Sequence, residues 1–374
     1  MRTKNVPCII NNVQSNVNPF RVLVKGVLLF LIFEFALYSL TPNLGFINLY
    51  APLGLERQRF PISTLDPVDA ALDVDNLDAM VASHIVSRPK APDEYRVLVL
   101  GDSAVWGLQI NPDQTLPNQL NALSLICGNK KVSTYNLSFP RSSSTKDLMI
   151  LDKVRQYQPD MIIWLITWYT LMPKTRVDHV LVDQNPEEFY KLGRRFDFLP
   201  KGYQPMSLLD KIESRQRTLF RVARYQLYTM VQLATGIDQL PGPPEVQSAG
   251  LTSDTTFEGL KPPTLRKSQV SLDQVQDFYQ LAGTTPVLLI NQPMLILDGI
   301  PNSDVRYNNY YPRWVYDQYR QYLGEAAAQN GWDYLDLWNI FPSSYFTDTP
   351  LHLTPDGEHQ LAEVISPSIL KTCQ

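Results

Sequence analysis

The segment Arg96-Val97-Leu98-Val99-Leu100-Gly101-Asp102-Ser103 is an apolar run that ends in a small polar turn. A continuous apolar run of this length is typical of a β-strand that is buried on both faces, as in a parallel sheet. In open α/β sheets, ligands bind beyond the carboxyl ends of such strands. The segment therefore predicts a parallel sheet with the hydroxyl of Ser103 at its functional edge.

Apolar runs and helical periodicities alternate along the rest of the 374-residue chain. Further strands are predicted at 132–137, 161–166, 286–290 and 332–335, and helices at 115–125, 145–157, 314–329 and 355–365. This alternation indicates a parallel sheet of about five strands with helices on both faces. We place this α/β domain at residues 93–370, with an insertion at about 171–285.

The composition narrows the class of protein. With 44% hydrophobic residues and a net charge of −4, the chain lacks the basic character of a nucleic-acid-binding protein, so we expect no nucleic-acid partner. No segment has the spacing of a zinc site or a phosphate-binding loop, so we expect no metal and no organic cofactor. The three cysteines lie far apart, and one bridge, Cys127–Cys373, is possible in an oxidising compartment. No pattern specifies an oligomeric state.

The N-terminal region contains an apolar segment, residues 22–40, which only Lys25 and Glu34 interrupt. A helix of this length, at about 1.5 Å per residue, just crosses a hydrocarbon layer of about 30 Å. Basic residues precede the segment, which predicts a cytoplasmic N-terminus and a domain outside the cytoplasmic membrane. The predicted order is a cytoplasmic segment at 1–20, a single-pass transmembrane anchor at 21–41 and a stalk at 42–92. A cleaved signal peptide is the alternative.

Three residues are candidates for serine-dependent acyl transfer, which needs a nucleophile, a base and donors for the oxyanion. Ser103 follows a buried strand and is the candidate nucleophile. His352 lies in the connection between the last strand and the last helix, and it is the candidate base. Asp348 is the nearest upstream carboxylate and would orient the imidazole.

Two blocks of the chain resemble those of the SGNH/GDSL hydrolase family. They are Gly101-Asp102-Ser103 and His352-Leu353-Thr354-Pro355-Asp356-Gly357, and the resemblance spans about residues 95–170 and 285–366. It implies a three-layer α/β/α, flavodoxin-like sandwich. It also implies that Ser103 is the nucleophile and that its own backbone N–H is an oxyanion donor.

The second and third blocks of the family are less well matched. In Asn136-Leu137-Ser138-Phe139-Pro140-Arg141, Ser138 stands where the family usually has glycine, and the resemblance implies its backbone N–H as a further oxyanion donor. Thr167-Trp168-Tyr169-Thr170 replaces the Gly-x-Asn-Asp of the third block, so the asparagine donor is absent. The hydroxyl of Thr167 or of Tyr169 is the candidate replacement.

The fourth block departs from the family pattern by one residue in the spacing between its aspartate and its histidine. Asp348 stands four residues before His352, whereas the family usually places its aspartate three before, where this chain has Thr349. An added loop residue can be absorbed, so Asp348 remains the candidate. An outward-facing member without the full third block also resembles the envelope acyltransferase branch, such as the D-alanyl transfer protein of teichoic acid synthesis and the alginate O-acetyltransferases.

Other residues are candidates for substrate binding. Asn291 and Gln292 end the fourth strand and are expected to line the pocket, unless they serve packing and turn formation. Arg306 lies in the aromatic-rich segment 303–314, where it could hold an anionic group while aromatic rings stack on sugars. The alternative is a loop that packs against the sheet. Residues 211–235 predict a basic amphipathic helix, which lies either on anionic lipid or on its own domain.

The function that these patterns predict is that of a membrane-anchored serine esterase or acyl-transfer enzyme outside the cytoplasmic membrane. It would act through an acyl-enzyme on Ser103 with His352 as base. The expected substrate is an acylated small molecule, glycan or envelope polymer. The alternative is a non-catalytic envelope scaffold that retains the fold, which the missing third-block asparagine favours.

Overall fold

The computed structural model describes residues 18–39, 56–61, 76–235, 250–347 and 349–373. Within these ranges, one sheet has the strand order β2-β3-β1-β4-β5-β6. The strands are β1 (Glu94–Leu100), β2 (Ile126–Cys127), β3 (Lys130–Asn136), β4 (Met161–Ile166), β5 (Val287–Asn291) and β6 (Asp333–Asp336). All neighbours pair in parallel except β2 and β3, which are antiparallel.

The parallel strands have a flavodoxin-like order. When β1, β3, β4, β5 and β6 are numbered along the chain, they stand side by side as 2-1-3-4-5, which is the flavodoxin-like arrangement. The predicted α/β/α fold with about five parallel strands is thereby confirmed. The strand order reverses between β1 and β4, so the topological switch point, where such sheets bind ligands, lies beyond Leu100 and Ile166.

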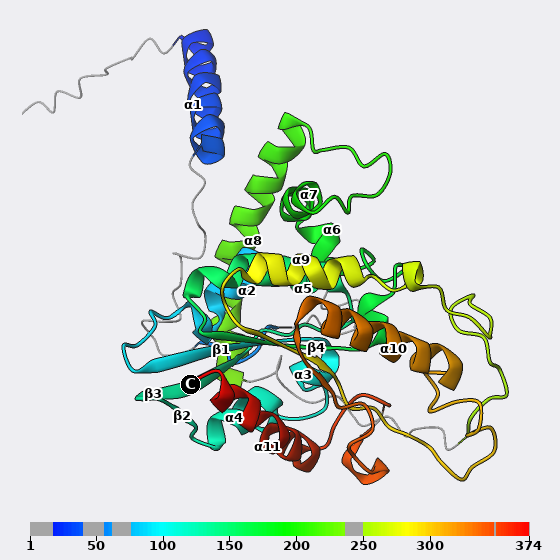
Figure 1. Cartoon of the computed structure of the whole chain (residues 1–374). Helices are drawn as coiled ribbons and strands as arrows, with labels where there is room; N and C mark the ends of the chain where they lie inside the picture. The colour runs from blue at the N-terminus through cyan, green and yellow to red at the C-terminus, as the bar shows by residue number, and fades with distance from the viewer. Residues whose placement is uncertain (1–17, 40–55, 62–75, 236–249, 348, 374) are drawn as a thin grey trace, which may run out of the picture.

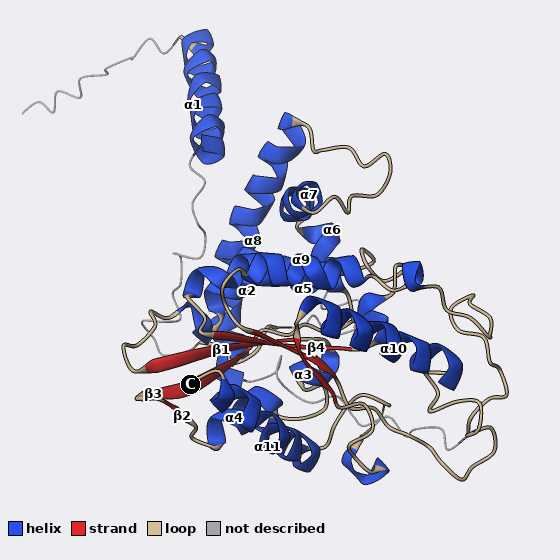
Figure 2. Cartoon of the chain, in the orientation of Figure 1, coloured by secondary structure: helices blue, strands red, loops and turns tan. Residues whose placement is uncertain are grey.

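Helices cover both faces of the sheet, as Figures 1 and 2 show. α4 (Leu116–Ala122) and α11 (Pro355–Lys371) lie on one face, and α5 (Ser144–Val154), α9 (Leu272–Ala282) and α10 (Arg313–Asn330) lie on the other. β1 contributes to both cores because successive side chains of a strand alternate. Val97 and Val99 join the core under α4 and α11, whereas Leu98 and Leu100 join the core under α5.

The insertion predicted at 171–285 is shorter in the structure, because its last part belongs to the sandwich. α9 is the crossover helix between β4 and β5, and Phe278 stacks on Trp164 of β4 with ring centroids 3.9 Å apart. The helices that remain outside the sandwich are α6 (Val180–Gln184), α7 (Pro186–Arg195) and α8 (Leu208–Thr235). α8 is the helix expected at 211–235.

Part of the segment predicted as a stalk, residues 42–92, belongs to the domain. α2 (Leu77–Ser83) is buried along nearly its whole length, and Phe60 is fully buried in the core that α2 also enters. The sequence hides this packing because a helix of seven residues has too few turns to show a clear period. Residues 40–55 and 62–75, and residues 1–17 of the predicted cytoplasmic segment 1–20, lie outside the described residues.

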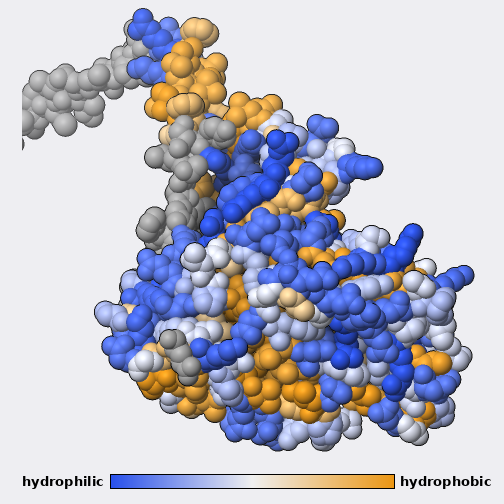
Figure 3. All heavy atoms as spheres, viewed as in Figure 1, coloured by the Kyte–Doolittle hydropathy of each residue, from blue (hydrophilic) through white to orange (hydrophobic). Residues whose placement is uncertain are grey.

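α1 (Pro19–Ser39) occupies most of the segment predicted as a transmembrane anchor, residues 21–41. In the described part of the chain, no helix combines the length and the apolar character needed to cross a membrane. The transmembrane anchor at 21–41 therefore stays a prediction. Figure 3 shows the apolar residues of α1 at the surface, in agreement with the exposure of their side chains.

A disulfide joins the edge of the sheet to the end of the last helix. It links Cys127 of β2 to Cys373, which follows α11, across 246 residues of sequence. The sequence showed this disulfide to be possible, and the structure contains it. A crosslink that closes a loop of this size stabilises the fold largely by restricting the unfolded chain.

Candidate active site

The turn after β1 presents Ser103. α3 (Ser103–Trp106) begins directly after the strand, and the Asp102 side chain caps it by accepting a hydrogen bond from Ala104 N at 3.0 Å. Gly101 is required at this point, because a Cβ there would lie 2.5 Å from Val105 Cγ2. Ser103 therefore stands at the first position of a short helix at the switch point of the sheet.

His352 is brought to the same place from the other end of the domain. Its Nε2 lies 2.9 Å from Ser103 Oγ, although 249 residues separate the two in sequence. The loop that carries His352 is held at both ends: Thr347 N donates to His352 O at 2.9 Å, and Thr354 caps α11 by accepting from Gly357 N at 3.1 Å. The predicted nucleophile and base thus share one hydrogen bond, while His352 is buried and Ser103 is half-buried.

The third member of the predicted triad, Asp348, lies outside the described residues, so its role stays a prediction. Thr349, which stands where the family usually has its aspartate, has a different contact. Its Oγ1 accepts a hydrogen bond from the backbone N–H of His352 at 3.2 Å. Thr349 therefore supports the backbone of the base.

Of the two backbone donors expected for an oxyanion, one is engaged elsewhere. Ser138 is fully buried, and its N–H donates to Asn136 Oδ1 at 3.3 Å, as does its hydroxyl. The reason is local: Asn136 ends β3, and an asparagine side chain readily bonds the backbone two residues on. The Ser138 N–H thus makes a turn contact in this structure, and its role as an oxyanion donor stays a prediction. The Ser103 N–H makes no hydrogen bond within the described residues.

The turn after β4 places the hydroxyl of Thr167 inside the protein. Thr167 Oγ1 accepts hydrogen bonds from Tyr169 N at 3.1 Å and from the Tyr311 hydroxyl at 3.2 Å. Thr170 Oγ1 in turn accepts from Thr167 N at 3.2 Å. Thr167 is fully buried by these contacts, so it is corrected from candidate donor to helix cap.

Tyr169 has the position in sequence that the family gives to its asparagine. Its ring is half-buried and packs against Phe257, Tyr310 and Tyr311, with ring centroids 5.5 to 5.9 Å away. Within the described part of the chain, its hydroxyl makes no hydrogen bond. Burial, chiefly, raises the pKa of Tyr169 to about 12, so the hydroxyl keeps its proton at neutral pH and can donate it.

Two of the predicted binding residues are structural. Asn291 is fully buried, where its Nδ2 donates to Asp336 at 2.8 Å and its Oδ1 accepts from Tyr316 and Tyr319. The guanidinium of Arg306 donates to the backbone carbonyls of Asn308, Asn309 and Tyr310 in its own loop and to that of Asp254 in a separate segment. Because these carbonyls engage the guanidinium, Arg306 is corrected from anion binder to a loop-forming residue.

Gln292, by contrast, does reach the site. It is buried, and its Nε2 donates to Asp102 Oδ2 at 3.3 Å, next to the nucleophile. It also lines a small cavity together with Ala104, Leu351 and Leu353, which flank the nucleophile and the base in sequence. The prediction that Gln292 lies at the site is consistent with this placement.

Arg59 contacts the nucleophile turn and was not among the predicted site residues. It is fully buried, and its Nη1 donates to the carbonyls of Trp106, Gly107 and Ile110 at 3.1, 2.8 and 3.1 Å. Its guanidinium also lies 3.8 Å from the centroid of the Trp106 ring. Arg59 thus holds the end of α3 from a segment that the sequence assigned to a stalk.

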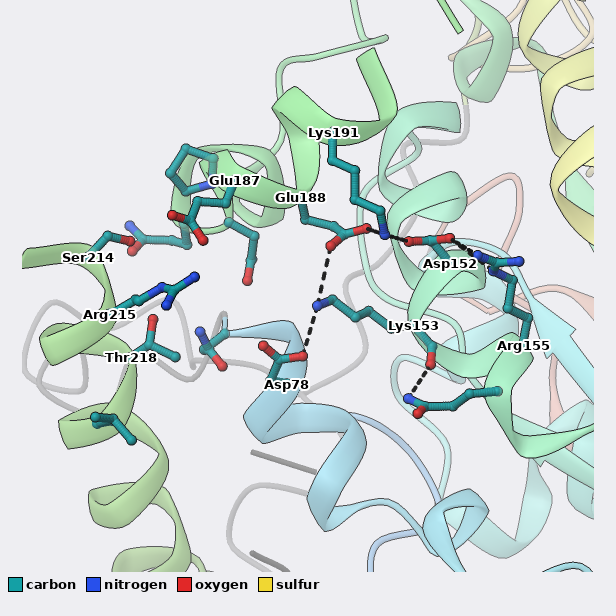
Figure 4. A pocket seen from close by; sticks show the side chains of 16 residues that line it. Asp78, Asp152, Lys153, Arg155, Glu187, Glu188, Lys191, Ser214, Arg215 and Thr218 are labelled. Carbon is teal, nitrogen blue, oxygen red and sulfur yellow. Dashed lines mark hydrogen bonds and ion pairs between the residues drawn. The ribbon is translucent and has the colours of Figure 1, made fainter. Parts of the chain in front are cut away.

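A larger cleft of about 670 Å³ lies away from these residues, between α2, α5, α7 and α8 (Figure 4). Its charged side chains pair with one another: Lys153 Nζ lies 2.9 Å from Asp78 and 3.3 Å from Glu188, and Lys191 pairs with Asp152. None of the predicted site residues lines it. No three histidine, cysteine, aspartate or glutamate side chains gather as a metal site among the described residues.

No family model matches the chain, and no curated protein matches it. Among solved structures, the chain is similar to a lipase/acylhydrolase from Enterococcus faecalis, with 12% identity and a TM-score of 0.38, over 74% of this chain and 95% of that one. It is also similar to a carbohydrate acetylesterase family member from Sinorhizobium meliloti, with 11% identity and a TM-score of 0.35, over 74% and 98% of the two chains.

A third similar structure is the aryl esterase of M. smegmatis, with 11% identity and a TM-score of 0.34, over 74% and 99% of the two chains. Proteins of the G-D-S-L lipase family are among the other similar structures. At such low TM-scores these similarities support no conclusion about function, which depends on the geometry of the site.

Proposed function

We propose that this protein is a serine esterase or acyl-transfer enzyme that works through an acyl-enzyme on Ser103. The observation that carries the proposal is the 2.9 Å contact between Ser103 Oγ and His352 Nε2 at the switch point of a parallel sheet. A nucleophile and a base within hydrogen-bond reach are the signature of covalent acyl transfer. The two residues come from opposite ends of the domain, and the fold brings them together at the carboxyl edge of the sheet, where ligands bind in open α/β sheets.

In the proposed reaction, Ser103 Oγ attacks the ester carbonyl while His352 Nε2 takes the hydroxyl proton. The bond to the alcohol then breaks, and His352 returns the proton to the leaving oxygen, which leaves the acyl group on Ser103. Water as the second nucleophile regenerates the serine and releases an acid, whereas a sugar hydroxyl would accept the acyl group. The developing oxyanion would accept hydrogen bonds from the Ser103 N–H and the Tyr169 hydroxyl.

The proposed substrate is an acylated small molecule, glycan or envelope polymer, and the proposed location is outside the cytoplasmic membrane. The Cys127–Cys373 disulfide supports this location, because such bonds persist in oxidising compartments. Attachment to the membrane through α1 is part of the proposal, and the exposed apolar side chains of that helix support it.

A fluorophosphonate probe tests the proposal directly, because it labels only serines activated for nucleophilic attack. We expect the wild-type protein to be labelled and the Ser103→Ala variant to be unlabelled. Ser253→Ala is the matched control, since Ser253 is an exposed loop serine, and it should be labelled like the wild type. Absence of labelling in the folded wild type would favour the scaffold alternative, to which the missing third-block asparagine points.

A further inference from the structure

Lys146 is a fully buried lysine near the start of α5. Burying an ammonium group is costly unless its N–H groups and its charge are satisfied. The charge is balanced by Asp147, whose Oδ1 lies 3.0 Å from Lys146 Nζ. The directed hydrogen bonds of Nζ, however, go to two backbone carbonyls, Gly101 O at 2.7 Å and Phe139 O at 2.8 Å.

These two carbonyls belong to different loops of the candidate active site. Gly101 begins the nucleophile turn after β1, two residues before Ser103, and Phe139 lies in the loop that follows β3. The two strands are neighbours in the sheet. A further bond, from Phe139 N to Gly101 O at 3.2 Å, joins the same loops, so Lys146 completes a direct bridge between them.

The loop after β3 has two more polar attachments. Ser142 Oγ donates to Asp102 Oδ2 at 2.7 Å, which ties the loop to the cap of the nucleophile helix. His179 Nε2 lies 3.0 Å from Pro140 O, and its Nδ1 accepts from Leu181 N, so Nε2 is the nitrogen that carries the proton. Burial, and then the nearby Lys146, lower the pKa of His179 to about 3, which keeps this ring neutral. The loop is therefore held rigidly against the nucleophile turn.

We propose that Lys146 is a positioning residue for acylation, which holds the nucleophile turn and the loop after β3 at a fixed separation. This inference rests on the proposed function. A buried ion pair can often be replaced by apolar side chains without loss of stability, so charge balance alone does not account for a lysine here. A positioning role does account for the lysine, because a displacement of about 1 Å in a catalytic group can cost about 100-fold in rate.

Three variants test the role of Lys146. Lys146→Met removes both carbonyl contacts but leaves Asp147 buried without its ion-pair partner, which risks misfolding. The double variant Lys146→Met with Asp147→Asn removes both charges and keeps both shapes, so it is the decisive one. Lys153→Met is the matched control on the same helix, since Lys153 pairs with Asp78 and Glu188 at the distant cleft.

For the double variant we expect kcat on a p-nitrophenyl ester to fall about 10- to 100-fold, with KM changed by less than about threefold because the pocket walls remain. Lys153→Met should keep the wild-type kcat. Circular dichroism confirms folding, and fluorophosphonate labelling of the wild type confirms the nucleophile. A folded double variant with the wild-type kcat would mean that Lys146 only neutralises Asp147, and would overturn this inference alone. An unlabelled wild type would overturn the proposed function and this inference with it.

Discussion

The turns after β1 and β4 begin at neighbouring strand ends and are built in the same way, yet they differ in what their hydroxyl groups do. In each turn a side chain caps the short helix that follows: Asp102 accepts from Ala104 N at 3.0 Å, and Thr167 accepts from Tyr169 N at 3.1 Å. In the first turn the cap is a carboxylate and the next residue carries the hydroxyl. In the second turn the hydroxyl residue is itself the cap.

The difference shows how a hydroxyl becomes available for chemistry. Because Asp102 satisfies the helix N–H, the hydroxyl of Ser103 is left to meet His352. Thr167 and Thr170 instead use their hydroxyls on the backbone of their own turn. Among the candidate replacements for the family's asparagine, Tyr169 is therefore the one whose hydroxyl the turn does not use.

The largest effect is expected for His352, the proposed general base that contacts the first turn. His352→Gln should lower kcat on a p-nitrophenyl ester by about 10⁴-fold or more, because the serine loses the group that takes its proton. Nucleophile and base act as a unit, so adding Ser103→Ala should cost little further. Steady-state kinetics of the two single variants and the double variant check this. The prediction fails if the double variant loses kcat by the product of the two single losses, or if His352→Gln keeps a kcat near that of the wild type. Either result would show that the 2.9 Å contact is not catalytic.

A smaller effect is expected in the second turn. Tyr169→Phe keeps the ring packing and removes the proposed donor, so kcat should fall about 100- to 1000-fold. Thr167→Val is the matched control; it should lower the free energy of unfolding by about 1 kcal/mol through loss of the cap, with kcat within a few-fold of wild type. If Tyr169→Phe turns over as fast as wild type, the second turn contributes no donor and the two turns differ more than we propose.

The last prediction concerns stability, not rate, beneath the first turn, where Glu358 of α11 lies near Ala104 and Val105. Burial raises its pKa from 4.5 to about 8, although a hydrogen bond from the Leu116 backbone opposes the shift. Between pH 4.5 and 8, the folded protein thus holds a proton that the unfolded chain releases. The free energy of unfolding therefore falls as pH rises through this window and levels off above it.

Glu358→Gln imitates the protonated carboxyl, so the variant should not lose free energy of unfolding as the pH rises. The variant should match the wild type near pH 4.5 and become the more stable protein by pH 8, with a difference that grows by at most about 1.4 kcal/mol per pH unit. Urea unfolding at several pH values measures it. Parallel stability curves for the two proteins would contradict the shifted pKa.

The parts of the molecule that the sequence predicted correctly are those with long or repeated patterns. The apolar runs at 96–100 and 161–166 could be assigned as buried strands because they are short, rich in β-branched residues and flanked by turn signals, and the order of helices and strands then limits the topology. The meeting of Ser103 and His352 follows once both are placed at carboxyl ends of the sheet. The transmembrane anchor at 21–41 stays a prediction, which rests on apolar length and on the basic residues that precede the segment.

The residues that were misassigned are polar groups whose partners are distant in sequence. Arg306 and Asn291 are residue types that often bind ligands, but the sequence does not show whether such a side chain binds a substrate or other groups of the protein itself. Lys146 and Arg59 were overlooked for the opposite reason. Each supports the candidate site through hydrogen bonds to distant backbone carbonyls, and the sequence does not show which carbonyls these are.

The separation of 249 residues between nucleophile and base also governs when the protein becomes active during its synthesis. Ser103 leaves the ribosome with the first strand of the sheet, whereas His352 emerges only after the last strand, β6, has been made. A growing chain therefore carries a serine with no group to take its proton. On the proposed function, ester cleavage would begin only once the loop that carries His352 has been made and has docked against the sheet, so the nascent polypeptide would be inert toward esters during its synthesis.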